Sequence, residues 1–329
     1  MTPSLPRLGV GTAGIGNLYA PVSDAEARAT VAAAFEAGIR YFDTAPHYGF
    51  GLAERRLGAT LAEADPRGEA IVSTKVGRIL EPSHSGARER HGFVEADPFE
   101  PRFDYRRDAI LSSHEESLKR LRRDRVDILL AHDLGTLTHG AEAERHMGDF
   151  LGSGHAAMRE LKHAGAIDLI GIGVNEIEVC EYLIERVEID LILIAGRYTL
   201  LDQSAGERLL PICQTRGIRV VIGGPYNSGI LAQPVAVQND LRYDYRAPPE
   251  PVLERAASLE QACAAQGVPL AAAALQFPLR HPAVSSVIPG PVGAAQLEET
   301  IERMNMPIPE SLWNTLDEAG LVRDPRVGA

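Results

Sequence analysis

Short apolar runs alternate with longer segments of helical periodicity along the whole chain. Runs rich in β-branched residues and leucine, bounded by turn residues, predict strands. Eight such runs occur: Leu8–Val10, Arg40–Asp43, Ile71–Lys75, Asp127–His132, Leu169–Val174, Asp190–Ile194, Arg219–Gly223 and Val284–Ile288. Because strands and helical segments alternate throughout, we expect an α/β protein with a parallel sheet closed as a (β/α)8 TIM barrel, in one domain spanning residues 1–329.

An open, doubly wound sheet is the structural alternative. That fold favours a glycine-rich turn that opens directly into the first helix. The turn at Gly9–Gly14 has no helix cap after it, since the first helical segment begins only near Ser23. The sequence therefore favours the closed barrel.

The segment Ser23–Ala37 shows how the helices are specified. Ser23 followed by Glu26 forms a capping box, which predicts a helix beginning at this serine. Helical spacing predicts that Ala27, Val31, Ala34 and Phe35 share a buried face. A further helix is predicted over Ile308–Ala319, which contains the single tryptophan, Trp313.

Three connections are too long to be simple turns: Val76–Arg106, Asp133–Phe150 and Gly224–Pro249. Loops of this length inside a domain are usually functional or disordered. All three leave the carboxyl ends of strands, where barrel enzymes build their pockets. The first and third are rich in Pro, Gly, Tyr and Phe, and we expect them to form ordered walls.

Composition narrows the partners. The net charge of −12 disfavours nucleic acid and anionic membranes as partners. Cys180, Cys213 and Cys263 form no Cys-x-x-Cys pattern, and we expect buried free thiols that suit a reducing cytoplasm. No secretory signal is visible, and no apolar run approaches the length of a membrane span. We therefore expect a soluble, cytoplasmic protein.

Four protonatable residues stand at or just beyond the ends of three successive strands. Asp43 ends one strand and Tyr48 follows it, Lys75 ends the next, and His132 ends the third. In a parallel barrel these groups converge on one open mouth. A lysine ammonium lowers the pKa of a nearby phenol, a carboxylate holds the ammonium, and a histidine donates to a substrate oxygen. These types fit proton transfer with Tyr48 as acid or base.

This constellation resembles the aldo-keto reductase superfamily, whose members are (β/α)8 barrels with an Asp-Tyr-Lys-His tetrad. The resemblance runs from Arg7 to Gly290, and its motifs are Phe42-Asp43-Thr44-Ala45, Tyr48-Gly49, the strand ending in Lys75, and Leu129–Asp133. Within the superfamily the chain looks most like the D-threo-aldose 1-dehydrogenase (L-fucose dehydrogenase) group. The pyridoxal 4-dehydrogenases look similar in the same segments: Phe99–Tyr105, Gly173–Glu176, Ala195–Leu201 and Gly223–Leu231.

The resemblance implies a nicotinamide dinucleotide lying across the carboxyl ends of the strands. The cofactor-binding residues that it implies are Thr12, Asn175, Gly224, Pro225, Tyr226, Ser228, Gly229, Ile230, Gly290, Gln296, Glu299 and Thr300. Glycines allow backbone amides to approach a phosphate, as does a helix amino terminus. The chain departs from the superfamily at Ala195, where a glutamine is common, and at Gly223, where an aromatic residue is common; Tyr226 and Tyr198 are candidate replacements for the aromatic residue.

The segment that is expected to bind the adenosine end of the cofactor favours NAD over NADP. The 2′-phosphate of NADP needs cations, usually arginine or lysine. Pro289–Glu302 contains neither, and it carries Gln296 together with Glu298 and Glu299. Arg303 is the nearest cation, one turn later. We expect NAD as the cofactor, with NADP less well suited.

The leading hypothesis is an NAD-dependent oxidoreductase that oxidises a cyclic hemiacetal, such as L-fucose or another D-threo-aldose, to its lactone. Oxidation of pyridoxal to 4-pyridoxolactone and general aldehyde or ketone reduction are alternatives. Tyr19, His47 and Arg78 are the candidate substrate-binding residues. A metal-dependent hydrolase with His47, His132, Asp133 and Asp43 as ligands, and a non-catalytic nucleotide sensor, are further classes. We expect no metal, and the oligomeric state stays open.

Overall fold

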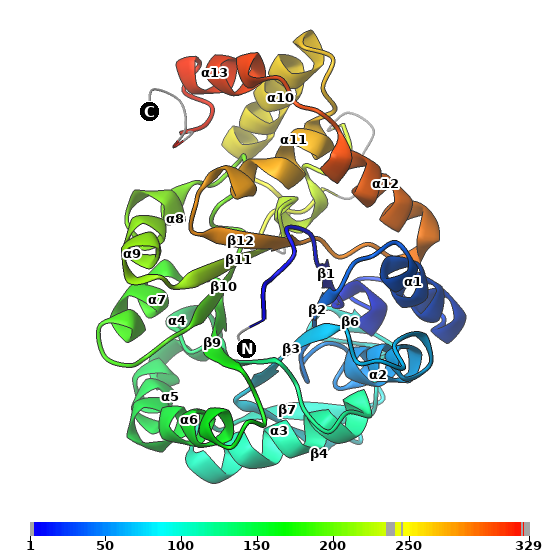
Figure 1. Cartoon of the computed structure of the whole chain (residues 1–329), viewed down its shortest axis with the longest axis vertical. Coiled ribbons are helices and arrows are strands. Elements are labelled where there is room, and N and C mark those ends of the chain that lie inside the picture. Colours follow the sequence, from blue (N-terminus) through cyan, green and yellow to red (C-terminus); the bar gives the residue numbers. More distant parts are fainter. Residues whose placement is uncertain (1–2, 235–240, 245, 324, 326–329) are drawn as a thin grey trace.

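The computed structural model describes residues 3–234, 241–244, 246–323 and 325. Eight parallel strands form one sheet in the order β1-β2-β3-β8-β9-β10-β11-β12. A parallel bridge between Leu8 and Val287, together with a hydrogen bond of 2.9 Å from the Gly9 amide to the Val287 carbonyl, joins the first strand to the last. Helices surround this ring (Figure 1), so the expected (β/α)8 barrel is confirmed.

The barrel strands fall where the sequence predicts them, with shifts of one or two residues at some ends. They are β1 (Val10–Gly11), β2 (Tyr41–Asp43), β3 (Ile71–Val76), β8 (Ile128–His132), β9 (Leu169–Val174), β10 (Leu191–Ala195), β11 (Arg219–Gly223) and β12 (Val284–Ile288). The first strand differs most from the prediction of Leu8–Val10, because Leu8 makes only the isolated bridge to Val287.

Side chains alternate between the bore of the barrel and the layer beneath the helices, as the two-residue period of a strand requires. The bore contains Tyr41, Ile128, Leu130, Leu169, Leu191, Leu193, Val221 and Ile288. Their neighbours Phe42 and Leu129 belong to the larger core under the helices. A residue two positions beyond a bore residue points the same way, so Asp43 and His132 continue the bore toward its open end.

The α-helices described are α1 (Asp24–Glu36), α2 (Leu52–Ala64), α3 (Arg107–Leu121), α4 (Thr136–His139), α5 (Ala143–Asp149), α6 (His155–His163), α7 (Ile177–Ile184), α8 (Ser204–Glu207), α9 (Leu209–Arg216), α10 (Glu250–Ala265), α11 (Leu270–Gln276), α12 (Gly293–Asn305) and α13 (Glu310–Glu318). Shorter helical turns are η1 (Gly14–Gly16), η2 (Gly140–Glu142), η4 (Asn227–Gly229) and η6 (Phe277–Arg280), with one π-helical segment, η3 (Phe150–Gly154).

The predicted cap of the first helix is present. The Ser23 hydroxyl accepts a hydrogen bond of 3.1 Å from the Glu26 amide, and α1 begins at the next residue, Asp24. Three of the four residues expected on the buried face are buried, but Phe35 is only partly so. Phe35 lies at the edge of the buried stripe, and the Arg40 guanidinium covers its ring, 3.8 Å from the ring centroid.

The first long connection is an ordered wall, as predicted, and it contains four strands that the sequence pattern did not reveal. β4 (Arg78–Pro82) pairs with β7 (Phe99–Phe103), and β5 (Glu89–Arg90) pairs with β6 (Phe93–Val94), both antiparallel. Short strands interrupted by proline and glycine give little periodic signal. The second connection folds into α4, η2 and α5.

The third connection is described only in part. The turn η4 follows β11, whereas residues 235–240 and 245 of the Gly224–Pro249 segment lie outside the described residues. The prediction of an ordered wall there is therefore tested only at the two ends of the segment.

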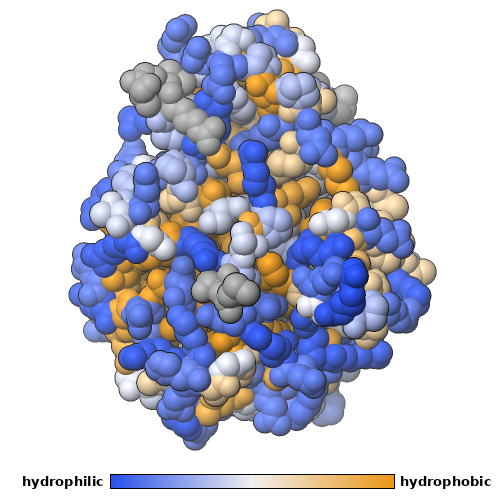
Figure 2. Space-filling view, viewed as in Figure 1, coloured by the Kyte–Doolittle hydropathy of each residue, from blue (hydrophilic) through white to orange (hydrophobic). Residues whose placement is uncertain are grey.

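The predicted carboxyl-terminal helix is α13, and Trp313 is buried at 2% exposure. The helix α13 lies beside α10 at the top of the molecule (Figure 1). The face seen in Figure 2 is mainly hydrophilic, with hydrophobic residues visible in patches between the hydrophilic ones. Among the described residues, no single helix has the length and hydropathy of a membrane span; only α10 and the following Leu270–Arg280 segment, bent by 102°, pass that test as a pair.

Candidate active site

The barrel brings the ends of β2, β3 and β8 to one mouth. Register places Asp43 beside Ser73 and Lys75 beside Leu130, so the acid and the lysine enter the bore from neighbouring strands. Tyr48 reaches the same place through a turn after β2, closed by a hydrogen bond of 3.0 Å from its amide to the Ala45 carbonyl.

Lys75 contacts both Asp43 and Tyr48 in this site. Its Nζ lies 2.7 Å from Asp43 Oδ2, 3.0 Å from the Tyr48 hydroxyl and 2.9 Å from the Thr44 carbonyl oxygen. Lys75 and Asp43 are each 2% exposed. Three acceptors around one ammonium fix its position, because Lys has three N–H donors and no acceptor.

Burial and charge oppose each other in this ion pair. Burial disfavours the Lys75 ammonium, but the charge of Asp43 and the contact with Tyr48 outweigh it, and the pKa of Lys75 lies above its ordinary value. Burial raises the pKa of Asp43, while Lys75 and Ser73 lower it. The ammonium therefore keeps its charge at neutral pH and stabilises negative charge on the phenol oxygen beside it.

Glycine in β9 makes room for the lysine. A Cβ at Gly173 would lie 3.1 Å from Lys75 Cε and 3.4 Å from its Cδ. The lysine side chain crosses the bore against this glycine, so a side chain on residue 173 would crowd the lysine.

His132 faces the phenol from the third strand. Its ring centroid is 6.1 Å from that of Tyr48 in an edge-on arrangement. Burial, then the charges of Arg78, Lys75 and His47, holds the pKa of His132 well below its ordinary value. The imidazole is therefore neutral near pH 7, and its buried Nδ1 has no partner among the described residues. A neutral imidazole can donate one hydrogen bond to an oxygen in the mouth.

An aromatic wall that the sequence did not assign covers one side of the phenol. Phe93 of β6 lies 6.3 Å from Tyr48 and 5.3 Å from His47, and Phe50 lies 5.9 Å from Phe93, all between ring centroids. The connection was predicted as a wall, but nothing in the sequence marks which of its aromatic residues turns inward.

The hairpin that carries Phe93 is tied to the loop after β1. The Tyr19 amide donates to the Gly92 carbonyl at 2.9 Å, and the Val94 amide donates to the Asn17 carbonyl at 3.0 Å. Tyr19, an expected substrate-binding residue, also lies under the Arg242 guanidinium, 4.2 Å from the ring centroid. The wall is therefore held at both ends.

Arg78, another expected substrate-binding residue, is 6% exposed and forms an ion pair with Asp133. Its Nε is buried without a partner among the described residues. The third candidate, His47, lies with its ring centroid 6.0 Å from that of His132, and burial lowers its pKa well below the ordinary value. The alternative metal set is disfavoured, because Lys75 and Arg78 occupy the carboxylates of Asp43 and Asp133.

The expected cofactor residues follow four other strands at the same mouth. Thr12 follows β1, Asn175 follows β9, Gly224 follows β11 and Gly290 lies just beyond β12. The hydroxyl of Thr12 is buried without a partner among the described residues. The side-chain amide of Asn175 donates a hydrogen bond of 3.3 Å to the Ala195 carbonyl. The segment after β11, which also holds Pro225, Ser228 and Ile230, contains Gly229, where φ is 106° and a Cβ would meet nothing within 4 Å. This open glycine-containing turn fits a bound phosphate.

Three expected cofactor contacts on α12 are engaged within the protein. Gln296 Oε1 accepts a hydrogen bond of 3.0 Å from the Val292 amide, and the Thr300 hydroxyl donates to the Gln296 carbonyl at 2.7 Å. Glu299 pairs with Arg303 at 2.8 Å. The expected contacts of Gln296, Glu299 and Thr300 with a cofactor stay predictions, and these hydrogen bonds fix the side chains at the start and middle of α12.

The two tyrosines considered for stacking on the nicotinamide differ in position. Tyr198 is 1% exposed and packs on Phe277 at 5.3 Å between ring centroids, so it belongs to the core under the helices. Tyr226 lies beside Arg303 of α12, and burial raises its pKa. Tyr198 is therefore not a replacement for the missing aromatic residue.

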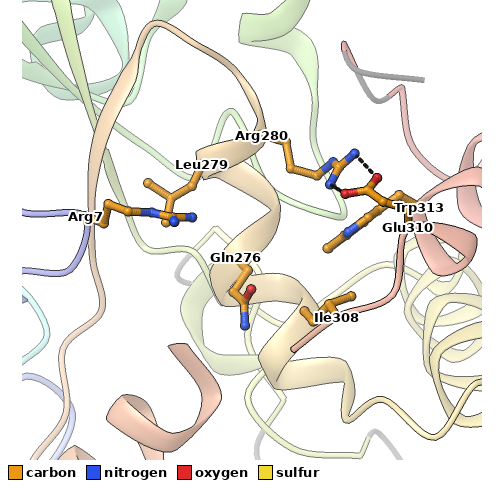
Figure 3. Close-up of a pocket in the computed structure, with 7 residues that line it drawn as sticks. All are labelled: Arg7, Gln276, Leu279, Arg280, Ile308, Glu310 and Trp313. Carbon is orange, nitrogen blue, oxygen red and sulfur yellow. Dashed lines mark hydrogen bonds and ion pairs between the residues drawn. The ribbon is translucent and has the colours of Figure 1, made fainter. Parts of the chain in front are cut away.

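A cavity of about 170 Å³ lies elsewhere, between η6, α13 and the segment before β1 (Figure 3). Arg7 and Arg280 precede β1 and β12, so the cavity lies toward the amino ends of the strands, opposite the mouth. Arg280 is held by Glu310 at 2.7 Å, and Gln276 donates to the Arg303 and Met306 carbonyls. Since none of the expected site residues lines it, we regard it as a packing crevice.

Comparison with known proteins agrees with this geometry. The model of the aldo/keto reductase family matches residues 7–320. The chain is 41% identical over 329 aligned residues to pyridoxal 4-dehydrogenase of Microbacterium luteolum, covering 97% of this chain and 95% of the relative. It is 40% identical over 327 residues to D-threo-aldose 1-dehydrogenase of a Pseudomonas species, covering 98% and 96%.

Solved structures show the same fold. An aldo-keto reductase of Bacillus halodurans in its holo form superposes with a TM-score of 0.73 at 24% identity, covering 96% of this chain and 92% of that one. A glycerol dehydrogenase of Gluconobacter oxydans superposes with a TM-score of 0.74 at 22% identity, covering 99% and 95%. The family match, the identity of 41% and 40% over 97% and 98% of this chain, and the barrel with its clustered Asp, Tyr, Lys and His together show that this chain is an oxidoreductase of the aldo/keto reductase family.

Proposed function

We propose that the protein oxidises a cyclic hemiacetal to its lactone with NAD. When bound, the nicotinamide ring accepts the hydride that leaves the hemiacetal carbon. The hydroxyl on that carbon loses its proton, the new C=O bond forms, and the products are the lactone, NADH and one proton. The observation that carries this proposal is the Tyr48 hydroxyl, 3.0 Å from a buried lysine that Asp43 holds at 2.7 Å.

In this proposal Tyr48 is the general base. Its phenolate, stabilised by the Lys75 ammonium, takes the hydroxyl proton of the substrate. Asp43 keeps the ammonium charged and in place. His132, neutral at physiological pH, donates a hydrogen bond to the same substrate oxygen and orients it. Such a set can assist reduction of an aldehyde or ketone in the reverse direction.

The choice of NAD rests on the charges of α12 and the segment before it. Pro289–Glu302 contains no Lys or Arg. The next cation, Arg303, is paired with Glu299 at 2.8 Å. A 2′-phosphate in this region therefore meets an arginine that is already neutralised, which favours NAD over NADP.

We expect Gln296→Arg to improve use of NADP. A charge-assisted hydrogen bond contributes about 1.5–3 kcal/mol, which corresponds to a gain of roughly tenfold to a hundredfold in kcat/KM. The change also removes the contact with the Val292 amide, so Gln296→Ala is the matched control. The measurement is kcat/KM for both cofactors in wild type and both variants. A wild-type enzyme that prefers NADP would contradict the proposal.

Two hemiacetal classes fit. Sugars such as L-fucose and other D-threo-aldoses present the reacting C–H and O–H pair in their ring form, and the D-threo-aldose 1-dehydrogenase relative supports them. Pyridoxal is the second candidate, because its internal hemiacetal presents the same pair on an aromatic ring. The wall of His47, Phe50 and Phe93 beside Tyr48 and the pyridoxal 4-dehydrogenase relative favour it.

The proposal includes a cytoplasmic location and one barrel domain over residues 1–329. Cys180, Cys213 and Cys263 are buried free thiols, which suits a reducing compartment. The net charge of −12 supports a small-molecule substrate rather than nucleic acid or an anionic membrane.

The test is production of reduced nicotinamide, followed by absorbance, with NAD or NADP and a panel of L-fucose, other D-threo-aldoses, pyridoxal and simple alcohols. The proposal predicts NADH formation with at least one hemiacetal and little with simple alcohols. Turnover of simple alcohols alone would refute it.

A further inference from the structure

A buried chain of hydroxyl groups approaches Asp43 from the side opposite Lys75. The Ser73 hydroxyl lies 2.7 Å from Asp43 Oδ1, and the Tyr41 hydroxyl lies 3.1 Å from Ser73 Oγ. Tyr41 and Ser73 are both fully buried. Neither Tyr41 nor Ser73 is among the residues proposed for proton transfer, cofactor binding or substrate binding.

Strand register produces this chain. Tyr41 and Asp43 both face the bore from β2, and Ser73 and Lys75 face it from β3. Asp43 pairs with Ser73 directly, so its two oxygens meet different partners: Oδ1 meets the serine and Oδ2 meets the lysine. The ring of Tyr41 lies over Gly9, where a Cβ would be 2.6 Å from Tyr41 Cδ1.

The direction of each hydrogen bond follows from the groups involved. An ionised carboxylate only accepts, so Ser73 donates its single hydroxyl hydrogen to Asp43. Ser73 has no second hydrogen for Tyr41, and Tyr41 must therefore donate to Ser73 Oγ. Burial and the charge of Asp43 raise the pKa of Tyr41 well above its ordinary value, so this phenol keeps its proton.

We propose that Ser73 and Tyr41 are positioning residues that act on Tyr48 through Asp43 and Lys75. The hydroxyl of Ser73 draws the negative charge of Asp43 toward Oδ1. Less of that charge then faces Lys75, and the ammonium is left freer to stabilise the phenolate of Tyr48. Tyr41 strengthens the effect, because a hydroxyl that accepts a hydrogen bond is a better donor.

Apart from the phenol of Tyr41, which Tyr41→Phe removes, the ionisable groups around this chain are the same in every variant below. They are Lys75 of β3, His132 of β8 and His47 of the loop after β2, with Arg78 of β4 and its partner Asp133 farther out. A change in Tyr48 ionisation that appears on altering Ser73 or Tyr41 therefore reports the hydroxyl chain itself.

Three substitutions test the proposal and one serves as control. Ser73→Ala removes the donor to Asp43, Ser73→Thr keeps a hydroxyl there, and Tyr41→Phe removes only the outer donor. Ser286→Ala is the matched control, because Ser286 is equally buried in β12 and its hydroxyl has no partner among the described residues.

The readout is a pH titration of the absorbance of the ionised Tyr48 phenol. It is obtained by subtracting, for each variant, the curve of the same variant carrying Tyr48→Phe. We expect Ser73→Ala to move the midpoint to higher pH by about half a unit to one unit, the equivalent of one hydrogen bond. Tyr41→Phe should move it less, in the same direction, whereas Ser73→Thr and Ser286→Ala should keep the wild-type midpoint.

An unchanged midpoint in both Ser73→Ala and Tyr41→Phe would overturn the proposal, as would an equal shift in Ser286→Ala. If Ser73→Ala does not fold, Tyr41→Phe decides the matter alone. The inference rests on the proposed function for its meaning, but the titration involves no turnover. A protein that fails to oxidise hemiacetals yet shows the shift would refute the proposed reaction and leave the hydroxyl chain standing.

Discussion

The phenol of Tyr48 is the only group of the four clustered residues that a neighbouring cation equips for proton transfer. Lys75 lies 3.0 Å away, and the imidazole of His132 is held neutral by burial and by nearby positive charge. Asp43 is engaged by Lys75 and Ser73. In the proposed reaction, proton transfer to and from the substrate therefore falls to the tyrosine.

We expect Tyr48→Phe to abolish turnover while leaving nicotinamide binding nearly intact. Loss of general base catalysis lowers kcat by about 10²–10⁴. The hydroxyl is removed without emptying the space of the ring, so the aromatic wall of Phe93 stays packed. Steady-state kinetics and a fluorescence titration with NADH measure the two effects. A variant that retains more than roughly a tenth of the activity would show that another group takes the proton.

The sequence identified site residues best where they stand at the ends of strands. Asp43, Lys75 and His132 were recognisable because a two-residue period carries the bore direction to the strand end. Ser73 was not singled out, although it lies two positions before Lys75 on the same face of the strand. Phe93 was not recognisable, since the direction of a side chain in a hairpin depends on contacts made far along the chain.

The strands determine how much room the site has, and β9 does so through a missing side chain. Gly173 lies in the middle of the path of Lys75 across the bore, where a Cβ would lie 3.1 Å from Lys75 Cε. A strand with a side chain at this position pushes the lysine away from Tyr48.

We expect Gly173→Ala to lower kcat by roughly tenfold, because a displacement of a few tenths of an ångström at the ammonium weakens both of its contacts. The matched control is Gly148→Ala in α5, where an added Cβ meets nothing within 4 Å. That change should leave kcat at the wild-type value. Equal effects of the two substitutions would mean that Lys75 tolerates the crowding.

Element boundaries were predictable where burial is continuous. β9, β11 and β12 match the sequence prediction because nearly every residue of each strand is buried. The cap at Ser23 was predictable because it is local. The antiparallel pairs β4–β7 and β5–β6 were not, since β4 and β7 are joined across a long segment and β5 and β6 are each only two residues long.

For the whole molecule, buried histidines couple stability to pH. Burial lowers the pKa of seven histidines: His47, His114, His132, His139, His146, His155 and His281. Below pH 6.5 the unfolded chain binds protons that the folded protein does not, so acid favours unfolding. Stability is therefore complete above the ordinary histidine pKa and is lost as pH falls toward the lowered values.

We expect the free energy of unfolding to fall between about pH 7 and pH 5.5, by up to about 1.4 kcal/mol per pH unit for each fully buried histidine. His114→Gln should reduce this dependence, because His114 is 4% exposed and its Nε2 has no partner among the described residues. His163→Gln, at an exposed position, should leave it unchanged. Urea titrations at the two pH values measure the slopes, and equal slopes in all three proteins would contradict the argument.

The fate of the hydrogen on the hemiacetal carbon tests the central proposal most directly. A hemiacetal substrate, pyridoxal or L-fucose, deuterated at that carbon is incubated with NAD and the protein, and both products are analysed by mass spectrometry. We expect one deuterium in the reduced nicotinamide for each lactone formed, and none with Tyr48→Phe. Lactone without deuterium in the cofactor, or deuterium transfer undiminished in Tyr48→Phe, would contradict the proposal.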